Sequence, residues 1–254
     1  MEIAVSNTIV YGLVFTRLIT SIALNPIFSR RNMPMRIRLG FVLVLTLLIA
    51  PLVNTQGITE LSEIRFILYL FKEALIGFVF GYLTQLFQFM LFFVGDLLDF
   101  HFGLSMAKIF DPSTTMQVSS VGNYLQVIFV VMFFMSGSHL HLIRLIVMSF
   151  EYMPLFEGIN VLAISSYVMD AFLDVFMIAL KLALPFIFVQ FVVEMAMGVL
   201  MKLIPQIHVF VINIQLKILV GIILLIVMLQ PITHFIDEYI GTMIKAIQFY
   251  LLLS

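Results

Sequence analysis

Acidic and histidine side chains are the first candidates for chemistry in this chain. Asp96, Asp99 and His101 lie close together in the sequence and carry oxygen and nitrogen atoms of the kinds that bind metal ions. The same side chains could instead form a solvated cluster at the end of a helix, which we favour. His139 and His141 are two residues apart, so on a helix they point in different directions and make a poor metal pair. We expect neither a metal ion nor a cofactor.

A second acidic pair lies further along the chain. Asp170 and Asp174 share one helix face at a spacing of four residues, with Lys181 about two turns beyond. Such a set could relay protons in a transporter, or it could form the polar side of an amphipathic helix that packs on partner proteins. The sequence patterns of zinc peptidases, P-loop proteins, dinucleotide-binding folds and serine hydrolases are absent. We therefore predict that the chain is not an enzyme.

The composition predicts a membrane protein. Of 254 residues, 63% are hydrophobic and 11% are charged, whereas soluble domains carry about 25% charged residues. So few charges could not cover a water-exposed surface, and lipid or other apolar protein must therefore face most of the molecule. The chain has no cysteine, which excludes disulfides and thiolate metal sites. Its net charge of −1 indicates no nucleic-acid partner.

Long apolar runs predict helices that position these residues. The runs are uniformly apolar and do not alternate every second residue as barrel strands do, so we expect an all-α membrane protein. A hydrocarbon core of about 30 Å needs roughly 20 helical residues. The hydropathy pattern predicts six spanning helices, in the runs Ile3–Thr16, Leu39–Val53, Ala74–Gly95, Pro112–Ile143, Leu182–Val193 and Ile218–Ile236. The arginine-rich connection at residues 30–38 would then lie in the cytoplasm and both termini outside.

Charged residues inside the apolar stretches need partners. Lys72 and Glu73 interrupt one such stretch, and a charge at the centre of a lipid-facing helix costs about 2.5–3.5 kcal/mol. The pair is either a snorkelling or paired structural charge at a helix end, or a contact with a neighbouring subunit or a water-filled path. The run Leu182–Val193 is too short to span unless its helix continues past Lys181 and Glu194.

Small residues and prolines predict how the helices pack. Gly77 and Gly81 are spaced for close approach of two helices in a membrane. Kinks or helix ends are expected at Pro185, Pro205 and Pro231. We expect helix or subunit packing at Lys72, Glu73, Gly77, Gly81, Lys181, Glu194, Lys202 and Pro205.

The segment from Gly103 to Met116 combines turn formers with large apolar side chains. Gly103, Asp111-Pro112 and a Ser/Thr run predict a loop. Because water would not favour its apolar residues, they must be buried against something. The loop is either re-entrant and packed on its own protein, or a hydrophobic constriction that closes a pore, a role that flexible methionine suits. The constriction would be formed by Met106, Ile109, Phe110 and Met116.

Three stretches of the sequence resemble the FliR family, the flagellar type III export-gate components, whose virulence-secretion relatives share the pattern. They are residues 72–81, which begin Lys-Glu-Ala-Leu-Ile-Gly-Phe, residues 103–112 of the central loop, and residues 205–221, which begin Pro-Gln-Ile-His-Val-Phe-Val. The stretches are spread along the chain. The sequence departs from the family at residues 213–215, Asn-Ile-Gln, where relatives often carry Gly and Pro. That departure concerns the local bend of the last helix.

The resemblance implies kinked helical hairpins packed in a multi-subunit export gate in the bacterial inner membrane, inside the flagellar basal body. Residues 1–165 would be FliP-like and residues 166–254 FliQ-like, and the loop at residues 103–122 would plug the channel. The implied partners are FliP, FliQ, FlhB and FlhA, and the cargo would be unfolded flagellar subunits. Two alternatives remain open: a virulence type III secretion gate subunit, and an ion-coupled secondary transporter.

Overall fold

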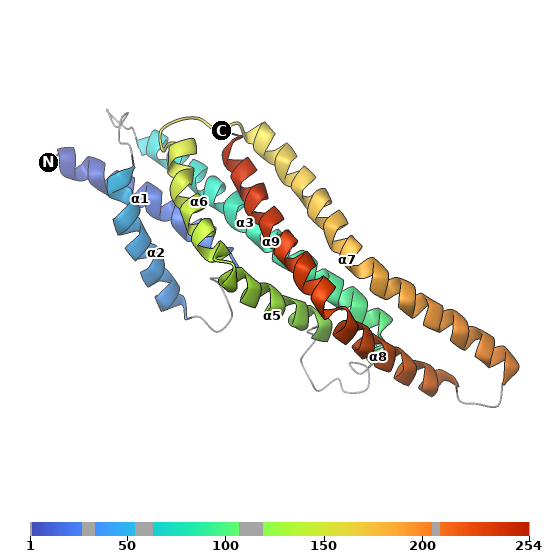
Figure 1. Cartoon of the computed structure of the whole chain (residues 1–254). Coiled ribbons are helices and arrows are strands. Elements are labelled where there is room, and N and C mark those ends of the chain that lie inside the picture. Colours follow the sequence, from blue (N-terminus) through green and yellow to red (C-terminus); the bar gives the residue numbers. More distant parts are fainter. Residues whose placement is uncertain (1, 27–33, 54–62, 107–118, 205–208, 254) are drawn as a thin grey trace. The chain divides into compact units, whose positions relative to one another are not determined.

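The computed structural model describes residues 2–26, 34–53, 63–106, 119–204 and 209–253, with side chains described from residue 8 and, after residue 204, from residue 212. In these ranges every regular element is a helix, which confirms the predicted all-α class (Figure 1). The elements are α1 (Glu2–Ala23), α2 (Met35–Ile49), the 3-10 turn η1 (Ala50–Leu52), α3 (Glu63–His101), α5 (Ser120–Met135), α6 (Ser138–Tyr152), α7 (Val161–Leu203), α8 (Val209–Val227) and α9 (Leu229–Leu251).

Within the residues that the structure describes, fewer helices are long and apolar enough to span a membrane than the six predicted. In the described part of the chain three are long and apolar enough: Met35–Leu52, α3 and α7. Two further pairs reach that length only together, α5 with α6 at a bend of 72° and α8 with α9 at a bend of 63°, which gives up to five. Hydropathy measures apolar length and does not detect a bend such as the one beside Gly137, whose φ is +72°.

The apolar run at residues 182–193 is the centre of a much longer helix. α7 extends over 43 residues and continues unbroken through Lys181 and Glu194. Pro185 lies inside it and does not end it. The helix ends at Leu203, and Pro205 lies outside the described residues.

The chain forms two compact units from interleaved segments. Unit 1 comprises Met1–Phe87, Ser136–Phe172 and Gly241–Ser254, and unit 2 comprises Gln88–Met135 and Leu173–Ile240. Each unit therefore depends on contacts between segments that are distant in the sequence. The long helices α3, α7 and α9 contribute residues to both units.

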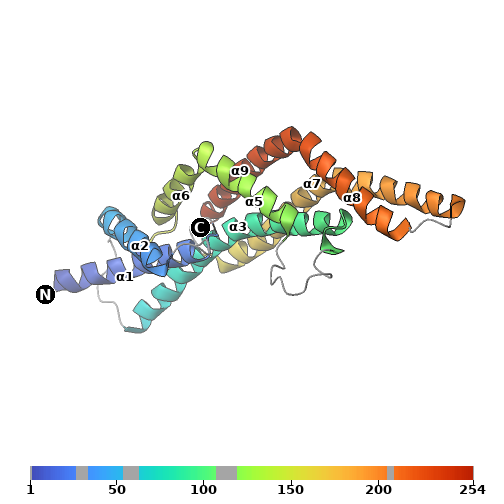
Figure 2. The same ribbon diagram turned by 90° about the horizontal axis from the view of Figure 1, so that it is seen from below.

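In unit 1, α1 packs on α2 and on the first half of α3, which it accompanies in both views (Figures 1 and 2). A Cβ atom at Gly77 would overlap the Thr20 hydroxyl and the Arg17 carbonyl of α1, and one at Gly81 would lie 2.8 Å from the Leu24 Cβ. The two glycines therefore allow the backbones of α1 and α3 to approach closely.

Candidate functional site

The two ends of the predicted plug loop lie in unit 2, where α3 stops and α5 begins. Met106 is the last described residue before the gap, and its side chain is 37% exposed. The other predicted plug residues, Ile109, Phe110 and Met116, lie outside the described residues. What the structure does describe is the base that holds the loop.

At the first end of the loop, glycine terminates α3. The Phe102 N–H donates to the Leu98 carbonyl at 2.8 Å, and the Gly103 N–H donates to the Phe100 carbonyl at 3.1 Å. Gly103 has a φ of +75°, in the left-handed region that side chains with a Cβ rarely adopt. The turn out of α3 therefore depends on glycine at this position.

Phe102 anchors this end in the interior of unit 2. Its side chain is buried, and its ring lies against Gly221 of α8, where a Cβ would come within 2.6 Å of the Phe102 Cγ. The Phe186 ring of α7 is an aromatic neighbour of Phe102, with ring centroids 6.3 Å apart. The base of the loop is thereby packed against two helices from the second half of the chain.

At the second end of the loop, Asp99 caps α5. Its carboxylate is fully buried and accepts hydrogen bonds from the N–H groups of Ser120 at 2.7 Å and Val121 at 3.1 Å. The Ser119 hydroxyl accepts a third from the Gly122 N–H at 2.8 Å. These are donors that a helix start leaves unsatisfied, and a carboxylate is favoured there by the helix dipole.

The burial of Asp99 corrects the expectation of a solvated acidic cluster. Asp96 is exposed, but Asp99 is not. Among the described residues, no group of three His, Asp or Glu side chains could hold a metal ion. The position of Asp99 close to Asp96 in the sequence suggested that the Asp99 side chain would face solvent. In the structure, Asp99 instead accepts hydrogen bonds from backbone N–H groups of a helix that begins about twenty residues later.

Close backbone approach brings α5 to this carboxylate. A Cβ at Gly95 would overlap the Gly122 backbone, so α3 and α5 touch at a pair of glycines. The first turn of α5 therefore lies directly on α3, within reach of Asp99. The sequence did not identify either glycine, because their spacing along the chain matches no helix-packing motif.

Polar contacts also join α7 to α8. The Gln190 side-chain amide donates to the Lys217 carbonyl at 3.0 Å, and the Lys217 ammonium forms an ion pair with Glu194. Glu194 is still 49% exposed, so this pair lies at the surface of the described unit. Two other predicted packing residues, Lys181 and Lys202, are exposed on α7.

A buried ion cluster lies in unit 1, around Arg17 of α1. The Arg17 Nε donates to the Glu73 Oε2 at 2.5 Å, and both side chains are within 1% of complete burial. The remaining guanidinium nitrogens donate to the carbonyls of Ser149 at 2.7 Å and Met153 at 2.8 Å. The guanidinium also stacks over the Phe150 ring, 4.2 Å from its centroid.

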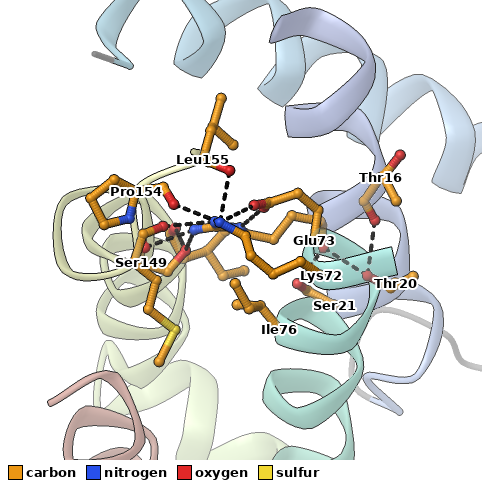
Figure 3. Close-up of polar contacts among 12 residues, drawn as sticks. Thr16, Thr20, Ser21, Lys72, Glu73, Ile76, Ser149, Pro154 and Leu155 are labelled. Carbon is orange, nitrogen blue, oxygen red and sulfur yellow. Dashed lines mark hydrogen bonds and ion pairs between the residues drawn. The ribbon is translucent and has the colours of Figure 1, made fainter. Parts of the chain in front are cut away.

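Lys72 extends the cluster along the same segment. Its ammonium lies 3.1 Å from the Glu73 Oε1 and donates to the carbonyls of Pro154 at 2.7 Å, Leu155 at 2.7 Å and Glu157 at 3.0 Å. Figure 3 shows Lys72 and Glu73 of α3 directed toward this segment. The two cations therefore hold the end of α6 and the chain that follows it.

The chemistry of this cluster is structural. The carbonyls that the two cations contact belong to the last turn of α6 and to the residues just after it, where the helix end carries a partial negative charge that cations offset. Lys72 and Glu73 thus have partners within the same chain, as one of the two sequence interpretations proposed. Arg17 was missed, because it directly follows the apolar run Ile3–Thr16. The sequence feature that could have identified Arg17 is that it is a charged residue lying between that run and further apolar residues.

The remaining candidates do not converge on either site. Asp170 and Asp174 have exposed side chains on α7, and His141 is exposed on α6. In the described part of the chain, the charged side chains that have buried partners form ion pairs or cap a helix. These contacts hold helices in position.

Comparisons with known proteins point in one direction. The family model described as "Bacterial export proteins, family 1" matches residues 8–243. The chain is 29% identical over 223 residues to the flagellar biosynthetic protein FliR of Bacillus subtilis (strain 168), covering 87% of this chain and 86% of that protein. It is 29% identical over 224 residues to FliR of Escherichia coli (strain K12), covering 87% and 85%. It is 25% identical over 230 residues to Yop proteins translocation protein T of Yersinia pestis, covering 88% and 87%.

Proposed function

The chain belongs to family 1 of the bacterial export proteins, and from that premise we propose that it is a non-enzymatic subunit of the flagellar type III protein-export gate in the bacterial inner membrane. The observation that carries the proposal is the match over nearly the whole chain to relatives named as flagellar biosynthetic proteins. The apolar helices and the structural use of buried charge are consistent with it.

The gate would be assembled with FliP and FliQ, with FlhB and FlhA as further partners. In this proposal residues 1–165 are FliP-like and residues 166–254 are FliQ-like, and unfolded flagellar subunits pass through the shared channel. Co-expression with the FliP-like and FliQ-like chains of the same bacterium tests it, because a gate subunit co-purifies with them. Transport activity of the purified single chain, in the absence of these partners, would contradict it.

The loop at residues 103–122 would close the channel when no cargo is present. Its base is suited to that role, because Gly103 and the Asp99 cap hold both ends of the loop at defined places in unit 2. The seal would be formed by Met106, Ile109, Phe110 and Met116, whose apolar side chains resist wetting and therefore the passage of ions.

Changing Met106, Ile109 and Phe110 together to serine tests the seal. The assembled gate should then leak ions or small solutes across the inner membrane, measured as the collapse of an imposed ion gradient. A matched triple change to leucine keeps the loop apolar and should stay closed. Unchanged permeability of a correctly assembled serine variant would overturn the plug.

A virulence secretion gate is the second candidate, and the Yersinia pestis relative favours it specifically. A gate subunit would have nearly the same physical properties in both secretion systems, so the phenotype of a deletion strain decides between them. Loss of filaments and motility supports the flagellar gate, whereas normal motility with loss of effector secretion supports the virulence gate.

An ion-coupled transporter would use Asp170, Asp174 and Glu194 to bind protons or substrate. Family membership argues against it. The variant Asp170→Asn with Asp174→Asn should retain protein export, and transport of a small solute by the lone chain in vesicles would support the transporter instead.

A further inference from the structure

The polar contact between α7 and α8 in unit 2 leaves two buried oxygen atoms without a hydrogen-bond partner in the described part of the chain. They are the Gln190 Oε1 and the Asn213 Oδ1. The orientation of the Gln190 amide is fixed, because its nitrogen donates to the Lys217 carbonyl and a carbonyl can only accept. A buried amide oxygen without a donor is unfavourable, so an N–H group that reaches either oxygen gains a hydrogen bond there.

Lys217 has N–H donors that the described contacts do not use. An ammonium group carries three N–H bonds, and within the described residues one acceptor contacts it, the Glu194 Oε1. That ion pair is weakly held, because the Glu194 side chain is 49% exposed and water competes for it. The Lys217 side chain is only 14% exposed, so the acceptors nearest to its ammonium group are those of α7 and α8.

Asn213 lies within reach of the same ammonium group. α7 and α8 run in opposite directions (Figure 1), and Gln190 lies beside Lys217. Glu194 is four residues further along α7, and Asn213 is four residues back along α8, so the two acceptors lie at about the same level. Helix side chains lean toward the N-terminus, which directs Lys217 toward Asn213 on one face of α8. One ammonium group therefore has a partner on α7 and an alternative partner on α8.

The part of α8 that carries Lys217 also supports the end of α3. A Cβ on Gly103 would lie 3.8 Å from the Ile214 Cγ2 and 4.0 Å from the Lys217 Cβ. One turn further along α8, Gly221 lies against the Phe102 ring. Ile214, Lys217 and Gly221 are three and four residues apart, so they form one stripe of α8. Movement of this stripe relative to α7 therefore changes the support of the turn at Gly103.

We propose that Lys217 is a latch with two positions. In the first, which the structure shows, its ammonium group joins α8 to Glu194 of α7. In the second, it turns to the Asn213 Oδ1 on its own helix, the ion pair between the helices is lost, and the stripe that supports Gly103 is released. The two positions exchange one acceptor for another, so a new contact made by Glu194 can shift the balance between them.

This inference rests on the proposed function, in which the segment that begins at Gly103 closes the channel. The latch adds a control of that closure, because the first position holds the support of Gly103 in place and the second lets it move.

Substitutions at Asn213 that shift the latch in opposite directions test it. Asn213→Asp places a carboxylate one turn from Lys217 and favours the second position, whereas Asn213→Leu removes the second acceptor. The assay uses vesicles that contain the gate co-purified with its FliP-like and FliQ-like chains. The collapse of an imposed ion gradient should be at least about twofold faster for Asn213→Asp, and unchanged or slower for Asn213→Leu.

Glu194→Gln removes the first acceptor and should speed the collapse of the gradient about two- to fivefold. The matched control is Asp174→Asn, the same kind of change at an exposed carboxylate of α7, which should leave the collapse unchanged. Equal acceleration in both variants would overturn the role of Glu194.

Asn213→Asp separates a latch from a purely structural contact. An acidic residue four positions before a lysine stabilises a helix, so a structural role predicts no added leak from this variant. Equal leak from Asn213→Asp and the unmodified chain, or from Asn213→Asp and Asn213→Leu, would overturn the latch.

Hydrogen exchange tests the latch without the partner chains. The Gly103 and Met106 amides donate to the Phe100 and Gly103 carbonyls. In the detergent-solubilised full chain their hydrogens should exchange at least about twofold faster in Asn213→Asp, and unchanged exchange would overturn the latch. If exchange responds as expected while the chain fails to assemble with the FliP-like and FliQ-like chains, the proposed function fails and the latch stands, so the two failures are distinguishable.

Discussion

Arg17 and Glu73 form a buried ion pair 2.5 Å long between helices α1 and α3, across 56 residues of sequence. The other guanidinium nitrogens of Arg17 donate hydrogen bonds to carbonyls at the end of α6. One side chain therefore joins three helices of unit 1. Such a pair sets the geometry of a core, because either charge left alone there would be strongly unfavourable.

Removing one charge of this pair should destabilise the protein more than removing both. Glu73→Leu leaves the Arg17 guanidinium buried without its carboxylate, which costs about 3–5 kcal/mol. The double variant Arg17→Met with Glu73→Leu should recover much of that loss. Thermal unfolding of the detergent-solubilised protein measures both. The control Glu194→Gln breaks a half-exposed pair and should cost about 0–1 kcal/mol. Equal melting temperatures for the single and double variants would contradict this account.

Gly77 should tolerate no side chain. Gly77→Ala places a methyl group on the Arg17 carbonyl, so α1 must move away from α3, at a cost of about 1–3 kcal/mol for overpacking. Gly40→Ala is the matched control in α2, because a Cβ there meets nothing within 4 Å and alanine favours the helix. The melting temperature should fall for the first variant and hold or rise for the second. The reverse order would show that α1 and α3 do not pack at Gly77.

Asp99 should stabilise the start of α5. Asp99→Ala removes the acceptor for the Ser120 and Val121 N–H groups, and loss of a helix cap costs about 0.5–2 kcal/mol. Hydrogen exchange of those two amides should accelerate, measured by mass spectrometry of peptides from this region. Asp96→Ala, a change at an exposed carboxylate on the same helix, should leave their exchange unchanged. Acceleration in both variants would mean that the cap is not the cause.

Phe102 and Gly221 should be energetically coupled. Gly221→Ala directs a methyl group into the Phe102 ring and should destabilise the protein by about 1–3 kcal/mol. Combining it with Phe102→Leu removes the edge of the ring that collides, so the double variant should lose less than the sum of the single variants. A double-mutant cycle of unfolding free energies measures the coupling. Strict additivity would show that the ring does not occupy the gap left by Gly221.

The sequence by itself determined that this is a helical membrane protein. A helix satisfies the backbone hydrogen bonds within each long, uniformly apolar run. The low share of charged residues requires lipid or apolar protein to face most of the surface. It also determined that Lys72 and Glu73 need partners, because unpaired charges are costly among apolar residues. The resemblance carried by residues 72–81, 103–112 and 205–221 agreed with the family match.

Only the tertiary structure decided which groups meet. The partners of Lys72 and Glu73 are an arginine on α1 and carbonyls after α6, and nothing in local sequence spacing relates them. Asp99 lies near an exposed carboxylate in sequence, yet it caps a helix that begins about twenty residues later. The physical reason is the same in both cases. Hydropathy and helical periodicity are short-range properties, whereas burial and hydrogen-bond pairing depend on segments that folding brings together from distant parts of the chain.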